Sequence, residues 1–175
     1  GGVGQIFCQW AKSLGCKVIG TVGSDEKITA AKNNGCDFVI NYSKDDFAKK
    51  VIEFTKGKGV PVVYDGVGEN TFHKSIECLK TRGMMVSFGN ASGSLENIDV
   101  KKSIQPKGLY FTRPAMIHYL STQNELREAA DIMFEKIKLG KIKINIFKKY
   151  RLDDVAQAHK DLESRKIVGS AVIIP

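Results

Sequence analysis

Apolar residues recur at two spacings along the chain, and the two spacings alternate. Over residues 4–14, Ile6, Trp10 and Leu14 fall on one face at helical spacing, and Gly15 follows where such a helix ends. Short apolar runs rich in β-branched residues separate the helical stretches and predict strands. These runs are residues 17–22, 38–41, 60–65, 84–89 and 109–114.

Between the predicted strands, the helical pattern covers residues 24–35, 43–59 and 68–83. Strands that alternate with helices of this length indicate βαβ units and a parallel sheet covered on both faces. After a polar segment at 90–108, the pattern predicts a long helix over 124–139, a strand at 141–147, a helix at 153–164 and a final strand at 170–175. The sequence therefore predicts an α/β fold of the doubly wound, Rossmann type.

A glycine turn, "GGVG" at residues 1–4, opens the first predicted helix. In dinucleotide-binding folds such a turn lets the backbone and the helix N-terminus approach a pyrophosphate. Folds that bind NAD usually carry an acidic residue about 20 residues further on, at a strand end. Here the strand end is uncharged through Ser24 and Lys27 follows, which favours NADP. The alternative reading makes Asp25 and Glu26 ordinary first-turn acids and Lys27 a surface residue.

Composition narrows the picture further. The chain has 175 residues with 42% hydrophobic content, and it has neither a long uncharged apolar stretch nor a signal-like N-terminus. Its net charge of +8 is spread along the chain, densest between Lys136 and Arg151, and no aromatic-rich RNA-binding signature accompanies it. Four irregularly spaced cysteines favour a reducing cytoplasm over disulfides or zinc. The histidines, His73, His118 and His159, form no triad pattern, and no metal site is expected.

Five stretches together resemble the zinc-free quinone oxidoreductases, the ζ-crystallin-like branch of the medium-chain dehydrogenase/reductases. They are "GGVGQIFCQWAKSLGCKVIGTVGS", "VVYDGVG", "GMMVSFGNASG", "LYFTRP" and "LESRKIVGSAVIIP". The resemblance implies a Rossmann domain for NADPH at residues 1–140 and a segment at 141–175 that returns to a GroES-like catalytic domain. It also implies that this catalytic domain and the first strand of the Rossmann sheet are missing from the chain, and that the chain alone does not reduce quinones.

The resemblance assigns cofactor contacts residue by residue. Gly2, Val3 and Gly4 match the turn under the pyrophosphate. The residues that match the surroundings of the 2′-phosphate are Gly23, Ser24, Lys27, Tyr42 and Arg165. Val67 matches a position beside the adenosine, and Phe88, Gly89 and Phe111 match positions on the nicotinamide side. No side chain is assigned as catalytic, because the quinone pocket of the family is lined mostly by the other domain.

The strand from Leu109 to Arg113 comes last in the predicted sheet order and should lie at an edge, where it would pair with a second copy to form a homodimer. A helix from Asn124 that covers this edge is the competing interpretation. Two other functions stay open. One is a related NADPH-dependent enone or enal reductase, and the other is a non-enzymatic structural or RNA-binding role, which only the net charge favours.

Overall fold

A computed structural model of the chain describes residues 1–164 and 167–175. Contacts divide these residues into two units, each considered by itself. Unit 1 comprises Gly1–Lys44 and Glu128–Pro175, and unit 2 comprises Asp45–Arg127. Helix α6 (Gln123–Lys138) begins in unit 2 and ends in unit 1. The domain boundary predicted at residue 140 stays a prediction.

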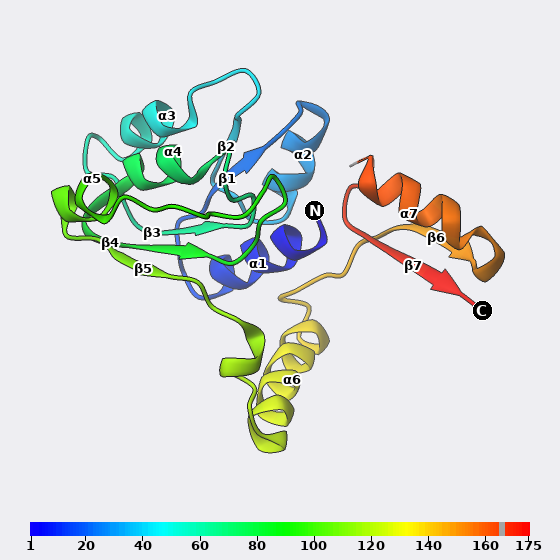
Figure 1. Cartoon of the computed structure of the whole chain (residues 1–175). Coiled ribbons are helices and arrows are strands. Elements are labelled where there is room, and N and C mark those ends of the chain that lie inside the picture. Colours follow the sequence, from blue (N-terminus) through cyan, green and yellow to red (C-terminus); the bar gives the residue numbers. More distant parts are fainter. Residues whose placement is uncertain (165–166) are drawn as a thin grey trace. The chain divides into compact units, whose positions relative to one another are not determined.

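The first part of unit 1 is a helix followed by a βαβ unit (Figure 1). Helix α1 (Gly2–Ser13) is followed by Gly15, which has a φ of 80° and whose N–H donates to Lys12 O of the last turn. Strands β1 (Ile19–Val22) and β2 (Phe38–Asn41) pair in parallel and are joined by α2 (Glu26–Asn33). The first and last residues of these four elements lie within two residues of the predicted ones.

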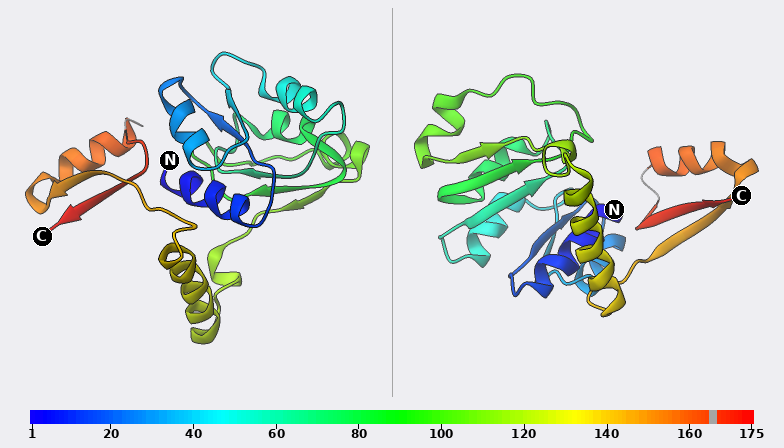
Figure 2. Two further views of the ribbon diagram at one scale, coloured as in Figure 1. Left: turned by 180° about the vertical axis from the view of Figure 1, so that it is seen from behind. Right: turned by 90° about the horizontal axis from the view of Figure 1, so that it is seen from below.

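The last part of unit 1 is a second βαβ unit. Strand β6 (Ile146–Arg151) pairs in parallel with β7 (Ser170–Ile174). A 3₁₀ turn at Leu152–Asp154 and helix α7 (Val155–Glu163) connect them, and α7 lies along the two strands (Figure 2). The Asp161 carboxylate fastens α7 to β6 by accepting hydrogen bonds from Tyr150 Oη at 2.7 Å and Lys148 Nζ at 3.1 Å.

The strand predicted at residues 141–147 is wrong in position, because β6 begins at Ile146. The backbone N–H and C=O of Lys143 are occupied by the side chain of Gln9, which accepts at 2.8 Å through Oε1 and donates at 3.0 Å through Nε2. A backbone paired with a side-chain amide does not join a strand ladder. The ladder forms instead where Tyr150 can be buried against the partner strand.

Unit 2 is built on a three-stranded parallel sheet in the order β3–β4–β5. The strands are β3 (Val60–Asp65), β4 (Leu79–Ser87) and β5 (Tyr110–Thr112). Helices α3 (Phe47–Phe54) and α4 (Phe72–Glu77) lie on the same face of the sheet (Figure 1). Short helical segments follow at α5 (Val100–Ser103), Gln105–Lys107 and Met116–His118. The core is formed by Phe72, Ile76, Leu79, Met85 and Leu109.

The helix predicted at residues 68–83 and the strand predicted at 84–89 need correction. Helix α4 ends at Glu77 and β4 begins at Leu79. The ammonium of Lys107 donates to the carbonyl oxygens of Glu77 and Leu79 at 2.9 and 2.7 Å, which satisfies carbonyls that the next helical turn would have used. Leu79 is buried in the core, and Arg82, at φ 57°, lets the chain re-enter the sheet at Met84.

Strand β5 lies at an edge of this sheet, as predicted, since among the described residues it pairs only with β4. The predicted run of residues 109–114 shortens to Tyr110–Thr112. Leu109 is buried in the core, whereas Pro114 offers no N–H to continue the ladder. The parallel α/β class predicted from the sequence is confirmed in both units.

Candidate cofactor-binding site

The glycine turn forms the N-terminus of α1. Gly1 stands at the N-cap position and its carbonyl accepts from Gln5 N, so the helix is regular from Gly2 onward. The first turn carries no acidic residue, and no side chain caps it. The positive end of the helix dipole and the first-turn N–H groups therefore face outward without a negative partner from the cap. Such an end is suited to an anion.

Gly4 tests whether this end fits a pyrophosphate. A Cβ built on Gly4 would have no heavy atom within 4 Å among the described residues outside its own helix. The backbone of Gly4 is helical, so neither crowding nor a positive φ requires glycine here. A glycine inside a helix costs about 0.5–1 kcal/mol relative to alanine. The chain itself gains nothing from the missing side chain, whereas a group that approaches the backbone from outside would need that space.

Gly2 is explained differently. Its Cβ would lie 3.1 Å from Ser170 Oγ and 3.5 Å from Gly169 O, so the first turn of α1 packs against the loop that leads into β7. Gly169 has a φ of 118° and stands close to the amide of Gln5. This contact with the C-terminal segment was not predicted from the sequence. The glycine at 169 was its only local signal.

The ends of β1 and β2 bring two predicted residues together. A Cβ on Gly23 would lie 2.8 Å from the hydroxyl oxygen of Tyr42, so only glycine lets the phenol approach this loop. The backbone N–H of Tyr42 donates to Val22 O at 3.0 Å, and Ser43 Oγ donates to Gly23 O at 2.8 Å. The tyrosine hydroxyl is thus held at the tip of β1, as the sequence analysis expected for a shared site.

Ser24 and Lys27 complete this loop. Ser24 follows β1 and Lys27 lies in the first turn of α2, and the backbone N–H of Lys27 donates to Ser24 O at 3.2 Å. Both residues are partly buried. The segment of residues 23–27 thus carries a hydroxyl and a lysine, and the Tyr42 phenol, which follows β2, lies against it at Gly23.

Two acids, Asp25 and Glu26, stand between Ser24 and Lys27, and Asp25 is engaged by neighbouring side chains. Its carboxylate accepts from Asn41 Nδ2 at 2.7 Å and forms an ion pair with Lys44 Nζ. The Lys44 ammonium, followed by the Asn41 amide, lowers the pKa of Asp25, so the carboxylate stays ionised and paired. Sequence analysis missed Asn41 and Lys44, because their partnership with Asp25 depends on the pairing of β1 with β2.

In unit 2, Asp65 at the end of β3 organises the loop that follows. Its carboxylate is 4% exposed and accepts from four donors. Val67 N and Gly68 N donate to Oδ1 at 2.8 and 3.0 Å. Thr71 Oγ1 and Ser75 Oγ donate to Oδ2, both at 2.7 Å. This buried web fixes the conformation of the loop that carries Val67 and ties it to α4.

The loops after β3 and β4 lie against each other. Ser92 N donates to Val67 O at 2.8 Å, and Phe88 N donates to Asp65 O at 2.9 Å. A Cβ on Gly89 would lie 2.4 Å from Gly66 O, which no side chain tolerates. Val67, Phe88 and Gly89 are therefore brought together, and Gly89 is required by the approach of the two backbones as well as being a predicted cofactor contact.

Two aromatic side chains of unit 2 stay open to contact. Phe88, which follows the buried end of β4, is 43% exposed, and Phe111, in the edge strand β5, is 36% exposed. Phe111 packs edge-to-face on Phe72, with ring centroids 6.0 Å apart. Part of each ring is available to a flat apolar partner.

Arg113 stabilises the segment from Ser87 to Asn90, which carries Phe88. Its guanidinium donates to Ser87 O at 3.2 Å and to Asn90 Oδ1 at 3.3 Å, on either side of Phe88 and Gly89. Sequence analysis read Arg113 only as the end of an edge strand. Its position next to a proline gave no signal of this role.

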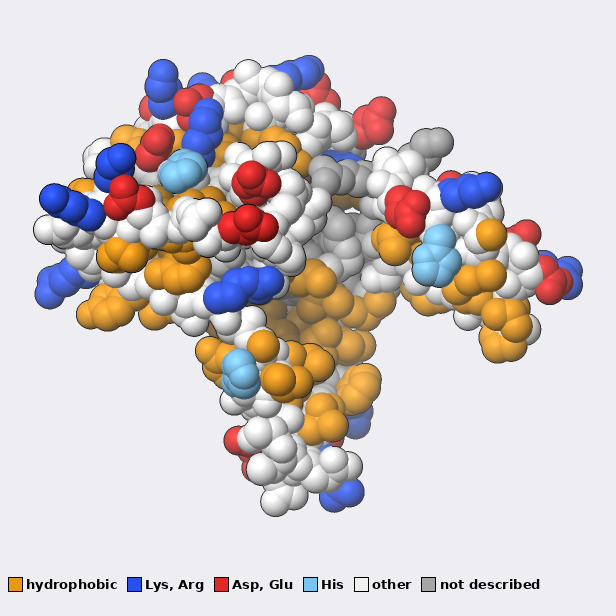
Figure 3. Space-filling view, in the orientation of Figure 1, with side chains coloured by type: hydrophobic (Ala, Val, Ile, Leu, Met, Phe, Trp, Pro, Cys, Tyr) orange, Lys and Arg blue, Asp and Glu red, His pale blue; other side chains and the backbone are white. Residues whose placement is uncertain are grey.

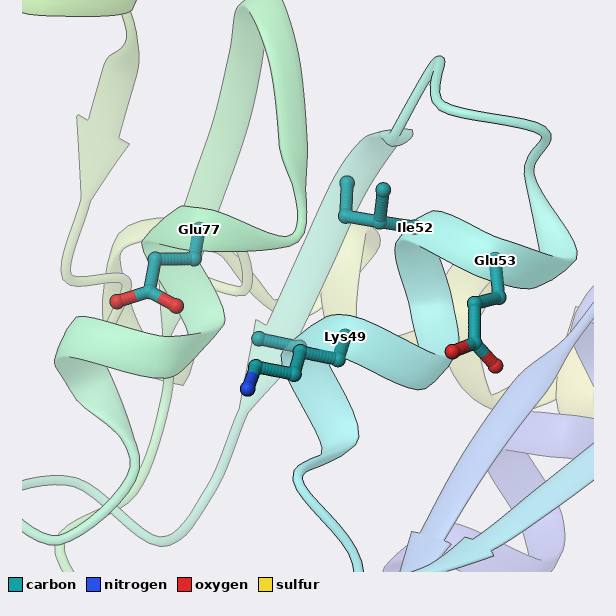
Figure 4. A pocket seen from close by; sticks show the side chains of 5 residues that line it. Lys49, Ile52, Glu53 and Glu77 are labelled. Atoms are coloured by element: carbon teal, nitrogen blue, oxygen red, sulfur yellow. The ribbon is translucent and has the colours of Figure 1, made fainter.

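Other features of the described residues do not add to this site. Arg165 lies outside the described residues. Within 1–164 and 167–175, no three His, Cys, Asp or Glu side chains are grouped to hold a metal ion, and no helix has the length and apolar character needed to cross a membrane. A depression of about 340 Å³ on unit 2 is lined by α3 residues and by Glu77 at the end of α4 (Figure 4). Its two carboxylates, Glu53 and Glu77, disfavour a phosphate.

Comparison with known proteins defines the class. The family model described as "Zinc-binding dehydrogenase" matches residues 2–135. The chain belongs to this family, and the matched residues begin within the glycine turn.

Particular relatives narrow the class further. Quinone oxidoreductase 1 of Escherichia coli (strain K12) is 46% identical over 177 residues, which cover 100% of this chain and 54% of that protein. A 2-haloacrylate reductase of Burkholderia sp is 43% identical over 176 residues, with 100% and 53% covered. The crystal structure of Escherichia coli quinone oxidoreductase complexed with NADPH superposes with a TM-score of 0.96 at 46% identity, covering 100% of this chain and 54% of that one.

The resemblance to quinone oxidoreductases is thereby confirmed, and so is the Rossmann-type fold. The chain spans about half the length of the curated relatives it matches.

Proposed function

We propose that this chain is the NADPH-binding part of an NADPH:quinone oxidoreductase. The observation that carries the proposal is Gly4, which stands at an uncapped helix N-terminus where the chain has no use for the missing side chain. The turn of Gly2, Val3 and Gly4 would hold the pyrophosphate through backbone N–H groups and the helix dipole. The similar Escherichia coli quinone oxidoreductase was crystallised in complex with NADPH, which supports the same cofactor.

The loop of unit 1 would hold the 2′-phosphate. Lys27 would supply the positive charge, and the hydroxyls of Ser24 and Tyr42 would supply hydrogen bonds. Because Lys44 and Asn41 engage Asp25, the negative charge of that carboxylate would be balanced within the protein, whereas Glu26 would lie in the exposed first turn of α2. Arg165, which the resemblance assigns to the same phosphate, belongs to the proposal on that ground alone.

The loops of unit 2 carry the other residues that the family resemblance assigns to the cofactor. Val67 would lie beside the adenosine, while the backbone of Phe88 and Gly89 and the ring of Phe111 would approach the nicotinamide. Partial exposure of both phenylalanine rings supports this role. When bound, NADPH would supply the two electrons that reduce the quinone, and the protein would contribute orientation and exclusion of water. Arg113 would keep the Phe88–Gly89 backbone in place.

An enone-type reductase is the second candidate, and the 2-haloacrylate reductase among the relatives favours it. Steady-state NADPH oxidation by the protein, joined to its catalytic domain, separates the two candidates. A quinone reductase should turn over simple quinones with a higher kcat/KM than α,β-unsaturated ketones or acids. The reverse order would favour the second candidate. A structural or RNA-binding role has only the net charge in its support, and acidic and basic side chains intermingle on the face in Figure 3.

Lys27→Ala should weaken NADPH binding by about 1–3 kcal/mol, the scale of a charge-assisted hydrogen bond, and should leave NADH binding nearly unchanged. Titration calorimetry of both cofactors measures the difference. Lys32→Ala is the matched control, because Lys32 lies in the last turn of the same helix. The assignment of Lys27 would have to be abandoned if both cofactors were weakened equally.

We further propose a cytoplasmic homodimer. The free cysteines of the chain fit a reducing compartment. Edge strand β5 offers an unpaired ladder to a second copy, and exposed apolar side chains follow it at Met116, Ile117 and Tyr119. Figure 3 shows hydrophobic side chains gathered over the segment between β5 and α6.

Tyr110→Pro should shift the protein from dimer to monomer, because proline removes a ladder donor from β5. Light scattering at micromolar concentration measures the mass. Tyr110→Phe, which keeps the backbone N–H of the strand, is the control and should leave the dimer in place. A monomeric mass for the unsubstituted protein would refute the dimer.

A further inference from the structure

Two cysteine thiols of unit 1 lie in direct contact. Cys8 lies in the middle of α1, and Cys36 lies in the turn between α2 and β2. Their sulfur atoms are 3.5 Å apart, and the Cys36 S–H donates to Cys8 Sγ. The residues are 28 positions apart, so their meeting is a product of the fold. Cys16 and Cys78, the other cysteines, have no sulfur partner among the described residues.

Contacts on both sides of the pair fix this approach. Gln9 Nε2 donates to Asn34 Oδ1 at 2.9 Å, and Lys12 forms an ion pair with Asp37. Between them, Gly35 has a φ of 96°, and a Cβ there would lie 3.3 Å from Cys8 O. The turn before β2 is therefore held against α1 on both sides of Cys36.

The residue next to the Cys36 sulfur in β1 is a glycine, which leaves space for the thiol. A Cβ on Gly20 would lie 2.6 Å from Cys36 Sγ, so the glycine in β1 makes room for this thiol. Cys36 is 7% exposed, whereas Cys8 is partly exposed. Of the two thiols, Cys8 is therefore the one that a small oxidant can reach, while Cys36 is buried beside it.

The hydrogen bond between the thiols differentiates their acidity. By donating its S–H, Cys36 lowers the pKa of Cys8, and the same bond together with burial raises the pKa of Cys36. Thiolates are the reactive form of cysteine, so the more accessible sulfur is also the more reactive one. Cys78 differs on both counts, because burial raises its pKa to about 12 and its thiol donates to Lys74 O.

We propose that Cys8 and Cys36 form a dithiol site that hydroperoxides oxidise to an intramolecular disulfide. The Cys8 thiolate attacks the peroxide oxygen, the O–O bond breaks, and Cys8 becomes a sulfenic acid as the alcohol or water leaves. The Cys36 sulfur then attacks the Cys8 sulfur, the S–O bond breaks and water leaves. In total, two thiols and one hydroperoxide give one disulfide, one alcohol (water from hydrogen peroxide) and one water. A dithiol reductant reverses the reaction by thiol–disulfide exchange.

The disulfide would join α1 to the start of β2. Closing a loop of this length in the unfolded chain stabilises the folded form, and the thermal midpoint of the protein should rise by roughly 5–10 °C on oxidation. The helix that carries the glycine turn would then be covalently fastened to the strand that leads to Tyr42.

The test exposes the unsubstituted protein to hydrogen peroxide, alkylates the remaining thiols with N-ethylmaleimide and analyses the intact and digested protein by mass spectrometry. We expect two of the four thiols to disappear together, with a loss of two hydrogen atoms and a linked pair of peptides containing Cys8 and Cys36. Dithiothreitol should restore all four. The proposal would be overturned if Cys8 and Cys36 could both still be alkylated after peroxide had oxidised Cys16. It would also be overturned if Cys8 became a sulfinic acid and no linked peptide formed.

Two serine variants add an independent readout. Cys36→Ser should stop the reaction at the Cys8 sulfenic acid, which dimedone traps, and should remove the rise in thermal midpoint. Cys78→Ser is the matched control, a buried cysteine without a sulfur partner among the described residues, and should form the disulfide at the same rate. An unchanged disulfide yield in Cys36→Ser would assign the link to another cysteine and contradict the proposal.

Discussion

Asp65→Ala should lower the free energy of unfolding by about 3–5 kcal/mol, the largest stability effect we expect from a single substitution in unit 2. The carboxylate accepts two backbone N–H groups and two side-chain hydroxyls while only 4% exposed. Alanine would leave these buried donors without an acceptor, and each unsatisfied donor costs about 1–3 kcal/mol before the loop relaxes. The loop that carries Val67 would lose its conformation first.

Urea unfolding at constant m-value measures the loss. Ser75→Ala is the graded control, because it removes one donor and leaves the carboxylate with three, and it should cost about 1 kcal/mol. NADPH affinity should fall in Asp65→Ala even under conditions where the protein stays folded. If Asp65→Ala were no more destabilising than Ser75→Ala, the carboxylate would not be the organising group.

Gly4→Ala should have opposite effects on stability and on binding. The new methyl group would enter space that no described residue occupies outside the helix, so α1 should gain about 0.5–1 kcal/mol in helical stability. The same methyl group would stand between the helix backbone and the pyrophosphate. We expect dinucleotide affinity to fall about 100-fold, which corresponds to about 2.7 kcal/mol, equally for NADPH and NADH.

Ala11→Gly makes the reverse change near the other end of α1 and should lower stability by about 0.5–1 kcal/mol without altering affinity. Thermal unfolding and titration calorimetry on the same samples give both quantities. Unchanged dinucleotide affinity in Gly4→Ala would mean that the glycine turn does not lie under the pyrophosphate.

Much of the fold was predictable because helices and strands differ in the spacing of their apolar residues, which can be seen within a short stretch of sequence. Helix α6 was predicted to within a residue at each end, and the strands of the first βαβ unit were found from short β-branched runs. The errors fell where a distant side chain sets the boundary. Lys107 ends α4 at Glu77, and Gln9 occupies the backbone of Lys143. No local pattern reports a partner 30 or more residues away.

The site followed the same rule. Glycines 2, 4 and 23 were singled out because turns next to strands are recognisable in sequence. Tyr42 came from the family resemblance, and the structure brings its hydroxyl close to Gly23. The neutralisation of Asp25 by Lys44 and the bracing role of Arg113 were missed, since each depends on two strands lying in register. Asp65 had a signal that was not used, namely an acid at the end of an apolar strand followed by hydroxyl residues at 71 and 75.

We propose that this chain binds NADPH through the glycine turn and the loop of Gly23, Ser24 and Lys27. Titration calorimetry of the protein with NADPH and, separately, with NADH tests it most directly. We expect one NADPH to bind per chain, at least about 10-fold more tightly than NADH, a difference of about 1.4 kcal/mol. Equal affinity for the two cofactors, or no binding of either at millimolar concentration, would contradict it.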